Sequence, residues 1–419
     1  ELWSRSESLD GLLEDLQRWE FLYKAPSEDH LVFFFRHALT REVTYHSLLS
    51  DRRRDLHRQA ALALERLYAG HLAEIYDRLT YHFPRAGEPE KTVQYLGLFA
   101  DRAARDFAHA EAAKALEEAL QHVDKLAPGK RDRSTLEILL KLADSLLPLA
   151  RFPETLELFN RYQDRAAAVD DLSLRARFHF WLAHTQTYLG DQDAARLEAK
   201  TAIEAASECD DEATEGKACY VLGRVGFWSG EFTDALESSL RAVVLLERSG
   251  EAWWQGQAYW VAGFNHYARG RFDAAVKALE RARSIGEALD DLRLDPSWSL
   301  GYFHASFGDG DAGIKHCRDG MNRSNDPLNR AVASGFLGHA LLQKKDLVAA
   351  IAALRESVER LRSTGMQQIL GWILGFLGEA YLADGRLEEA REAAAEGLAA
   401  TQEGSFLYGS GLAHKTLGR

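Results

Sequence analysis

Residues 222–242 read LGRVGFWSGEFTDALESSLRA and predict two helices joined by a tight turn. Small residues recur seven positions apart in each half, at Gly223 and Gly230 and again at Ala235 and Ala242. Gly230 begins a short polar turn, since glycine tolerates the backbone conformations that end helices. Small side chains at helical spacing let two helices approach closely, so this stretch predicts one helix–turn–helix unit.

The same pattern recurs along most of the chain at a period of about 40 residues. The residues equivalent to Gly230 are Ala150, Gly190, Gly270, Gly308, Lys345 and Gly385. Seven residues before each turn stands a small residue, namely Ala143, Ala183, Gly223, Gly263, Gly301, Gly338 or Gly378. Twelve residues after the first turn, Tyr162 interrupts a column that is otherwise small. Repeats of this length predict stacked helix pairs, each burying its apolar face only against its neighbours.

Composition and charge narrow the function classes. The chain of 419 residues holds 8 prolines and carries a net charge of −13. An acidic chain is a poor general nucleic-acid binder, because neutralising phosphates needs a basic face. The longest apolar runs, Leu31–Phe35 and Trp372–Phe376, are far shorter than the roughly 20 residues that cross a bilayer. Cys209, Cys219 and Cys317 lack metal-ligand spacing, so we expect reduced thiols in a cytoplasmic protein.

The repeat resembles the tetratricopeptide repeat. The Leu222-Gly223 pair, the small residue twelve positions on and the small residue seven further on match that family's columns. The period exceeds the family's usual length, which implies a longer second helix. We therefore expect an all-α fold, a right-handed superhelix of about nine helix–turn–helix repeats over residues 58–419. Leu417-Gly418 falls where the next Leu-Gly pair is due, so we expect the domain to stop within a repeat.

Residues 1–57 do not follow the period. Trp19–Tyr23 and Leu31–Phe35 are rich in β-forming residues and flank turn material at Pro26–Asp29. A helical segment at Leu12–Leu16 precedes them. A helix followed by a hairpin is typical of the end of a winged-helix module, so we expect residues 1–57 to form a short winged-helix-like arm with one β-hairpin.

The segment that follows the hairpin resembles signal-transducing ATPases with numerous domains (STAND ATPases). The resemblance rests on about 35 residues, namely Phe35-Arg36-His37-Ala38-Leu39, Tyr45, Leu48-Leu49, Arg52-Arg53-Arg54, Leu56-His57 and Ala60 to Glu65. It is similar to ATPases fused to adenylate or guanylate cyclases and to transcription activators related to the maltose-regulon activator. The resemblance implies a regulatory module whose nucleotide site lies upstream of this sequence.

Two motifs that mimic ligand sites are assigned to the repeat instead. Gly409–Thr416 is similar to a phosphate-binding loop, but His414 stands where that loop needs glycine. Gly308–Asp311 lacks the alternating oxygen ligands and closing glutamate of a calcium loop. The basic run Arg52–Arg54 lies beside acidic residues, which favours a solvated helix start. We therefore expect no catalytic residues, no metal and no cofactor.

Aromatic and basic residues share columns in the first helices of the middle repeats. Ten residues before the turn stand Phe180, Tyr220, Trp260 and Trp298, and six before it stand His184, Arg224, Phe264 and Tyr302. Beside these columns stand Arg177, Lys217, Gln257, Tyr188 and Trp228. The rings either line a concave groove for a ligand or fill the seam between neighbouring repeats. Both interpretations stay open, and Phe180, His184, Tyr220, Arg224, Trp228, Trp260, Phe264, Trp298, Tyr302, Arg177 and Lys217 are the candidate groove residues.

These features favour a regulatory protein–protein interaction and sensor module of a multidomain signalling ATPase. Its partner would be a protein, a peptide or a domain upstream in the same chain. The alternative is a sensor domain of a transcriptional activator that binds a small-molecule inducer. A stand-alone enzyme is the weakest alternative, and we expect neither a membrane nor a nucleic acid as partner.

Overall fold

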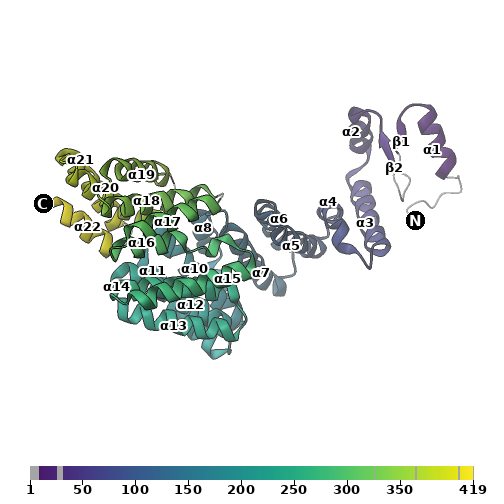
Figure 1. The fold of residues 1–419 in the computed structure, drawn as a ribbon. Helices are drawn as coiled ribbons and strands as arrows, with labels where there is room; N and C mark the ends of the chain where they lie inside the picture. The colour runs from purple at the N-terminus through teal and green to yellow at the C-terminus, as the bar shows by residue number, and fades with distance from the viewer. Residues whose placement is uncertain (1–8, 26–31, 325, 364–365, 404–405, 419) are drawn as a thin grey trace. The chain divides into compact units, whose positions relative to one another are not determined.

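A computed structural model describes residues 9–25, 32–324, 326–363, 366–403 and 406–418 (Figure 1). Within these residues the chain forms 22 α-helices and one two-stranded sheet, which confirms the predicted all-α repeat fold. The chain divides into two compact units, Glu1–Ala150 and Arg151–Arg419. In the described residues we find no helix with the length and apolar character needed to span a membrane.

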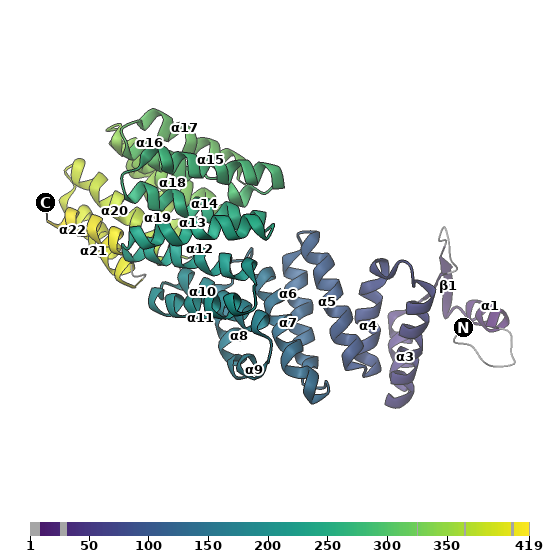
Figure 2. The ribbon, with the colours of Figure 1, turned by 90° about the horizontal axis from the view of Figure 1, so that it is seen from below.

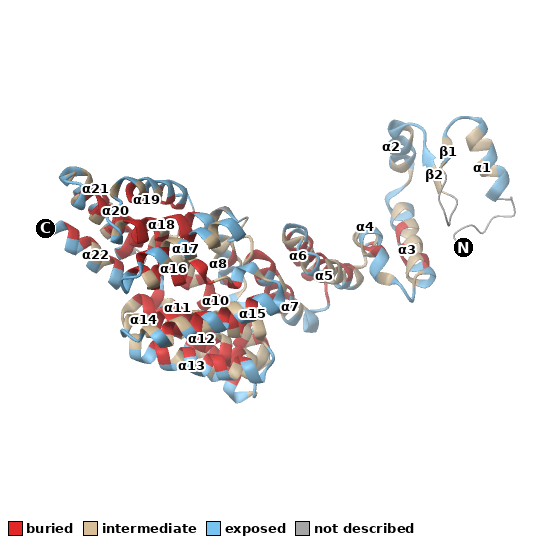
Figure 3. Cartoon of the chain, in the orientation of Figure 1, coloured by how far each residue is buried: buried red, intermediate tan, exposed pale blue. Residues whose placement is uncertain are grey.

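The first unit contains the hairpin expected between Trp19 and Phe35. Strand β1 (Leu22–Ala25) pairs antiparallel with β2 (Val32–Phe35), whereas the expected turn at Pro26–Asp29 lies outside the described residues. Helices α1 (Leu9–Arg18) and α2 (Ala38–Ser47) flank this hairpin and hold no buried residue (Figure 3). The unit continues as α3 (Ser50–Leu67), a 3₁₀ turn (Leu72–Ile75), α4 (Tyr76–Ala86), α5 (Pro89–Arg105), α6 (His109–Val123) and α7 (Pro128–Leu146).

The second unit consists of helix pairs that follow the repeat, as the ribbon in Figure 2 shows. Its first half comprises α8 (Phe152–Arg161), α9 (Gln163–Ala168), α10 (Leu172–Leu189), α11 (Gln192–Glu208), α12 (Glu212–Ser229), α13 (Phe232–Arg248), α14 (Ala252–Ala268) and α15 (Phe272–Leu289). Its second half comprises a 3₁₀ turn (Leu292–Leu294), α16 (Ser297–Ser306), α17 (Gly310–Arg323), α18 (Pro327–Gln343), α19 (Leu347–Leu361), α20 (Gln367–Ala383), α21 (Leu387–Glu403) and α22 (Leu407–Leu417).

The boundary between the units falls where the repeat pattern is interrupted. Tyr162 occupies a column that is small in the other repeats, and there the second helix of the pair breaks into α8 and α9. The division at residue 57 between an N-terminal arm and the repeats stays a prediction. The division found at Ala150–Arg151 lies at the turn that begins the interrupted repeat.

Every residue of the turn column has a left-handed backbone conformation. The φ angle is 54° at Ala150 and 64° at Lys345, and it lies between 71° and 100° at the five glycines of the column. The next residue is often an aspartate that accepts the backbone N–H three positions on, as Asp191, Asp309 and Asp346 do. Every position of the turn column therefore requires a left-handed backbone. Glycine adopts it at five positions, and Ala150 and Lys345 adopt it under strain.

We expect Lys345→Gly to stabilise the protein, because it relieves a left-handed conformation that costs a side-chain-bearing residue about 1–2 kcal/mol. The gain is reduced by the greater chain entropy of glycine in the unfolded state, which leaves a net stabilisation of about 1 kcal/mol or less. Gly385→Ala is the matched control, since φ is 79° there and an added Cβ meets nothing within 4 Å. Denaturant unfolding should show opposite signs for the two variants, and equal signs would contradict this account of the column.

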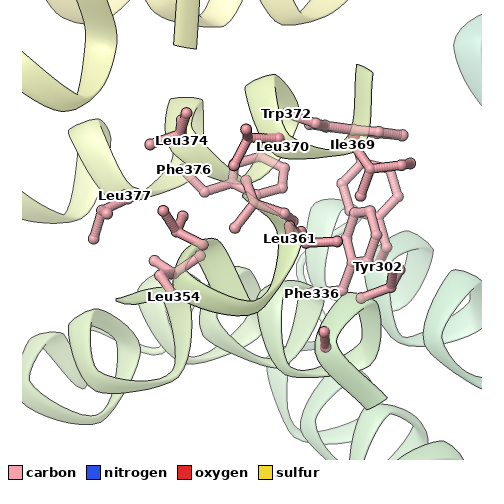
Figure 4. Packing of buried hydrophobic residues seen from close by; sticks show 14 of the residues in the cluster. Tyr302, Phe336, Leu354, Leu361, Ile369, Leu370, Trp372, Leu374, Phe376 and Leu377 are labelled. Atoms are coloured by element: carbon pink, nitrogen blue, oxygen red, sulfur yellow. The ribbon is translucent and has the colours of Figure 1, made fainter. Parts of the chain in front are cut away.

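The inner face of the second unit is filled largely by rings. Figure 4 shows part of this core, where Trp372 and Phe376 of α20 lie against Tyr302 of α16 and Phe336 of α18. Residues far apart in sequence close the unit, since Trp228 packs edge-on against Phe406 at 4.7 Å between ring centroids. The Nε2 group of Gln368 also donates a hydrogen bond to the carbonyl of Thr187 at 3.1 Å. The last repeats thus contact α10 and α12.

Candidate functional site

One open cavity of about 240 Å³ remains on this inner face of the second unit. Its walls come from both sides of the contact between early and late repeats, with α10 and α12 on one side and α20 on the other. The lining residues are Tyr188, Arg224, Trp228, Gln257, Trp260, Arg293, Leu294, Asp295, Trp298, Asp326, Leu328, Asn329, Val332, Met366, Gln368 and Ile369. Three tryptophans and five aliphatic or methionine side chains share this wall with one tyrosine and seven charged or amide side chains.

The structure brings four of the candidate groove residues together at this cavity, namely Arg224, Trp228, Trp260 and Trp298. Trp260 and Trp298 are only partly buried, and their ring centroids lie 5.5 Å apart in an edge-on arrangement. The Nε1 group of Trp260 donates to Ser299 Oγ at 2.9 Å, which fixes the orientation of the indole ring. Tyr188 and Gln257, which stand beside the same columns in the sequence, also line the cavity.

Five other candidates lie in the core instead of on the cavity wall. Each is at most 2% exposed, and the set comprises Phe180, His184, Tyr220, Phe264 and Tyr302. The physical reason is that neighbouring helices cover them. Trp254 of α14 packs against Phe180 at 5.2 Å and against Tyr220 at 5.7 Å between ring centroids. A column of equivalent positions therefore changes from core to cavity wall along the unit.

The two remaining candidates do not reach the cavity. Arg177 is partly buried and lies outside the lining. Lys217 forms an ion pair with Glu251, with 3.0 Å between Nζ and Oε1, and its ammonium group lies 5.8 Å from the Trp254 ring centroid. These cations are therefore separate from the aromatic walls, and Arg224 is the candidate cation that shares a surface with the tryptophans.

Arg224 is 9% exposed and is held by two tyrosines. Its guanidinium carbon lies 4.1 Å from the Tyr188 ring centroid, and one terminal nitrogen donates to the Tyr220 hydroxyl at 3.1 Å. The Nε–H group is buried without an acceptor. Although burial alone would lower the pKa of this arginine, the two tyrosines outweigh that effect and raise it, so the side chain stays charged.

The other charged groups of the cavity wall already have partners. Arg293 donates to both carboxylate oxygens of Asp291 at 3.0 Å. Asp295 accepts from the Ser297 hydroxyl at 2.6 Å, and Asp326 caps α18 by accepting the N–H of Leu328 at 3.0 Å. The electrostatic character of the cavity is therefore set by the buried Arg224, by Arg293 in its ion pair with Asp291, and by two hydrogen-bonded carboxylates.

Sequence reasoning missed the part of the wall that comes from later repeats. Val332, Gln368 and Ile369 line the cavity, but the aromatic columns end at Gly335 and Gly375, so the pattern points away from these helices. Trp254 was missed as well, because it stands outside the aromatic columns of the sequence. The closure that brings Gln368 to Thr187 joins residues 181 positions apart, and no periodic pattern signals it.

Comparisons with known proteins agree with this fold. No family model and no curated protein sequence matches the chain. A solved Rap protein complexed with competence and sporulation factor has a TM-score of 0.57 and 14% identity, covering 80% of this chain and 98% of its own. The quorum sensor NprR from Bacillus thuringiensis, in its apo form, has a TM-score of 0.53 and 14% identity, with 86% and 99% covered.

A third similar structure is a STAND protein with a tetratricopeptide repeat sensor from Pyrococcus horikoshii. Its TM-score is 0.54 at 14% identity, and the match covers 93% of this chain. The chain spans 58% of that protein's length. At such identities the similarity shows the fold alone, so this chain has a tetratricopeptide-like superhelical repeat fold.

Proposed function

We propose that the second unit is a regulatory sensor and protein-interaction module that binds a peptide or a segment of a partner protein at its cavity. The observation that carries the proposal is the cavity itself, where three tryptophans and a buried arginine from successive repeats share one surface. Tryptophan gives a large contact area at little cost in side-chain entropy, so such rings are good anchors. The module binds rather than catalyses, and it needs no cofactor or metal.

The similar structures support the sensor assignment. One of them is complexed with competence and sporulation factor, another is a quorum sensor, and a third carries a tetratricopeptide repeat sensor in a STAND protein. The string from Phe35 to Glu65 supports the further proposal that the chain belongs to a multidomain signalling ATPase, linked to a nucleotide cyclase or a transcription regulator. Its partner is then another cytoplasmic protein or a domain upstream in the same polypeptide.

The volume of the cavity is also compatible with a second candidate function, a sensor for a small-molecule inducer. Ligand sites in proteins usually measure about 300–1,000 Å³. A cavity of about 240 Å³ is smaller, so it accommodates one or two side chains of a peptide or a compact metabolite. In either case the ligand contacts helices on both sides of the closure, and its binding stabilises the contact between them.

We expect Trp260→Ala to weaken ligand binding while leaving the melting temperature within a few degrees of the wild type. The test is a thermal-shift screen of the full chain against short peptides and metabolites, followed by titration of each hit. The variant should weaken binding at least tenfold, which corresponds to about 1.4 kcal/mol. Trp19→Ala, which removes a tryptophan that is 62% exposed in the first unit, is the matched control. Hits that bind Trp260→Ala as tightly as wild type would show that the cavity is not the site.

A further inference from the structure

Arg224 is a buried cation without an anionic partner among the described residues. The groups that contact its guanidinium are the side chains of Tyr188 and Tyr220, and neither is a carboxylate. Burying a charge without an opposite charge is costly, and a tyrosine ring face and a hydroxyl recover only part of that cost. The remaining exposed part of Arg224 belongs to the wall of the cavity, so an anion that enters the cavity can reach it.

Neighbouring groups restrict the kind of anion that fits. His184 contacts the same tyrosines, and its pKa lies well below the ordinary range because of burial and the Arg224 charge, so it adds no second cation. Asp295 and Asp326 stand elsewhere on the wall and repel negative charge. The wall holds one further arginine, Arg293, whose charge is already paired with Asp291. A doubly charged phosphate would therefore meet one unpaired arginine beside two carboxylates, which is unfavourable. A singly charged carboxylate pairs with one guanidinium in a forked geometry.

We propose that the cavity binds its ligand through a single carboxylate that pairs with Arg224, while an adjoining apolar or aromatic group of the ligand contacts Trp228, Trp260 and Trp298. This inference rests on the proposed function and specifies its ligand class. The same chemistry comes from two sources, the free C-terminus of a peptide or a small carboxylic acid.

The test compares probes that differ only in charge. N-acetyl-tryptophan and 3-phenylpropionate are titrated into the full chain, each beside its uncharged amide, with binding followed by ligand-observed NMR. The acids should bind at least tenfold more tightly than the amides. Amides that bind as well as the acids, and are lost in Trp260→Ala, would overturn the carboxylate inference and leave the proposed function standing. Failure of every acid to bind would overturn the inference as well.

Variants of Arg224 test whether this side chain is the group that makes acids bind more tightly than amides. Arg224→Gln should bring acid and amide to equal affinity, whereas Arg224→Lys should keep a weaker preference because it retains the charge and loses the fork. Lys217→Gln is the matched control, since that cation is already paired with Glu251 and lies outside the lining. An undiminished acid preference in a folded Arg224→Gln protein would overturn the assignment. The wild-type probe comparison decides the matter if the variants fail to fold.

A third arm separates the two sources. Short peptides ending in leucine or phenylalanine are compared as free acids and as C-terminal amides, alongside the single-residue acids. Tighter binding of the free-acid peptides identifies a peptide C-terminus as the ligand. Tighter binding of the small acids identifies a metabolite, and inorganic phosphate, added as a further probe, should compete with neither. Competition by phosphate at equal concentration would contradict the preference for a singly charged group.

Discussion

Gly301→Ala is expected to destabilise the second unit by about 3 kcal/mol, at the upper end of the range for overpacked cores. Gly301 lies in α16 at a close approach to α17. A Cβ atom there would overlap Cys317 Sγ and would lie 2.9 Å from the Gly313 carbonyl oxygen. Because the carbonyl belongs to the backbone of the partner helix, the clash is relieved only by moving the helices apart.

Substitutions at two further glycines, Gly263 and Gly411, serve as comparisons for Gly301→Ala. An added Cβ at Gly263 would meet Leu279 Cδ2 at 3.0 Å, a side-chain atom that can shift, and the Ala275 carbonyl oxygen at 3.2 Å. Both contacts are longer than those at Gly301, so Gly263→Ala should cost less than Gly301→Ala. Gly411 lies within α22 with nothing inside 4 Å, so Gly411→Ala should be neutral or stabilise by up to about 1 kcal/mol. Urea unfolding of the three variants measures the order. Equal stabilities for Gly301→Ala and Gly411→Ala would refute close helix approach as the role of the column.

The features that the sequence predicts well are those set by local geometry. Gly230 and Lys345 occupy equivalent turns because the chain must reverse there with a left-handed residue, and this requirement repeats at each pair. Gly301 and Gly263 occupy equivalent places because helices of a pair approach closely there. An added Cβ would lie 2.9 Å from a backbone carbonyl oxygen of the second helix at Gly301 and 3.2 Å from one at Gly263. The side chain met there also differs, Cys317 at Gly301 and Leu279 at Gly263, and the column alone does not reveal it.

The cavity was predictable only in part, because it depends on contacts between distant repeats. Trp260 and Trp298 can be found by aligning columns, but Phe180 shares their column and is covered by Trp254. The far wall depends on closure of the unit, in which Gln368 bonds to Thr187. Closure results from the accumulated small rotations between successive repeats, a quantity that single-repeat patterns leave undetermined.

Acidification is expected to destabilise the second unit through two buried histidines. Burial lowers the pKa of His339 to about 3, with a smaller contribution from the Lys415 charge, and it lowers that of His184 well below the ordinary value. The unfolded chain binds a proton at each histidine near pH 6.5, whereas the folded chain does not until much lower pH. Stability contributed by neutral His339 is therefore complete above pH 6.5 and declines as pH falls towards 3. The loss is about 1.4 kcal/mol per pH unit for each histidine.

His339→Gln should reduce this pH dependence, because an amide can still bond to the Ser306 hydroxyl, which lies 3.1 Å from His339 Nε2, but does not take up a proton. The measurement is the difference in unfolding free energy between variant and wild type from pH 7 to pH 4.5.

The contributions of carboxylates that also titrate in this range cancel in that difference. His414→Gln, which removes an exposed histidine from α22, controls for the loss of one titratable side chain. The gap between His339→Gln and wild type should change by about 2–3 kcal/mol across the range, in favour of the variant at low pH. A gap that stays constant would mean that His339 takes up its proton in the folded protein as readily as in the unfolded chain.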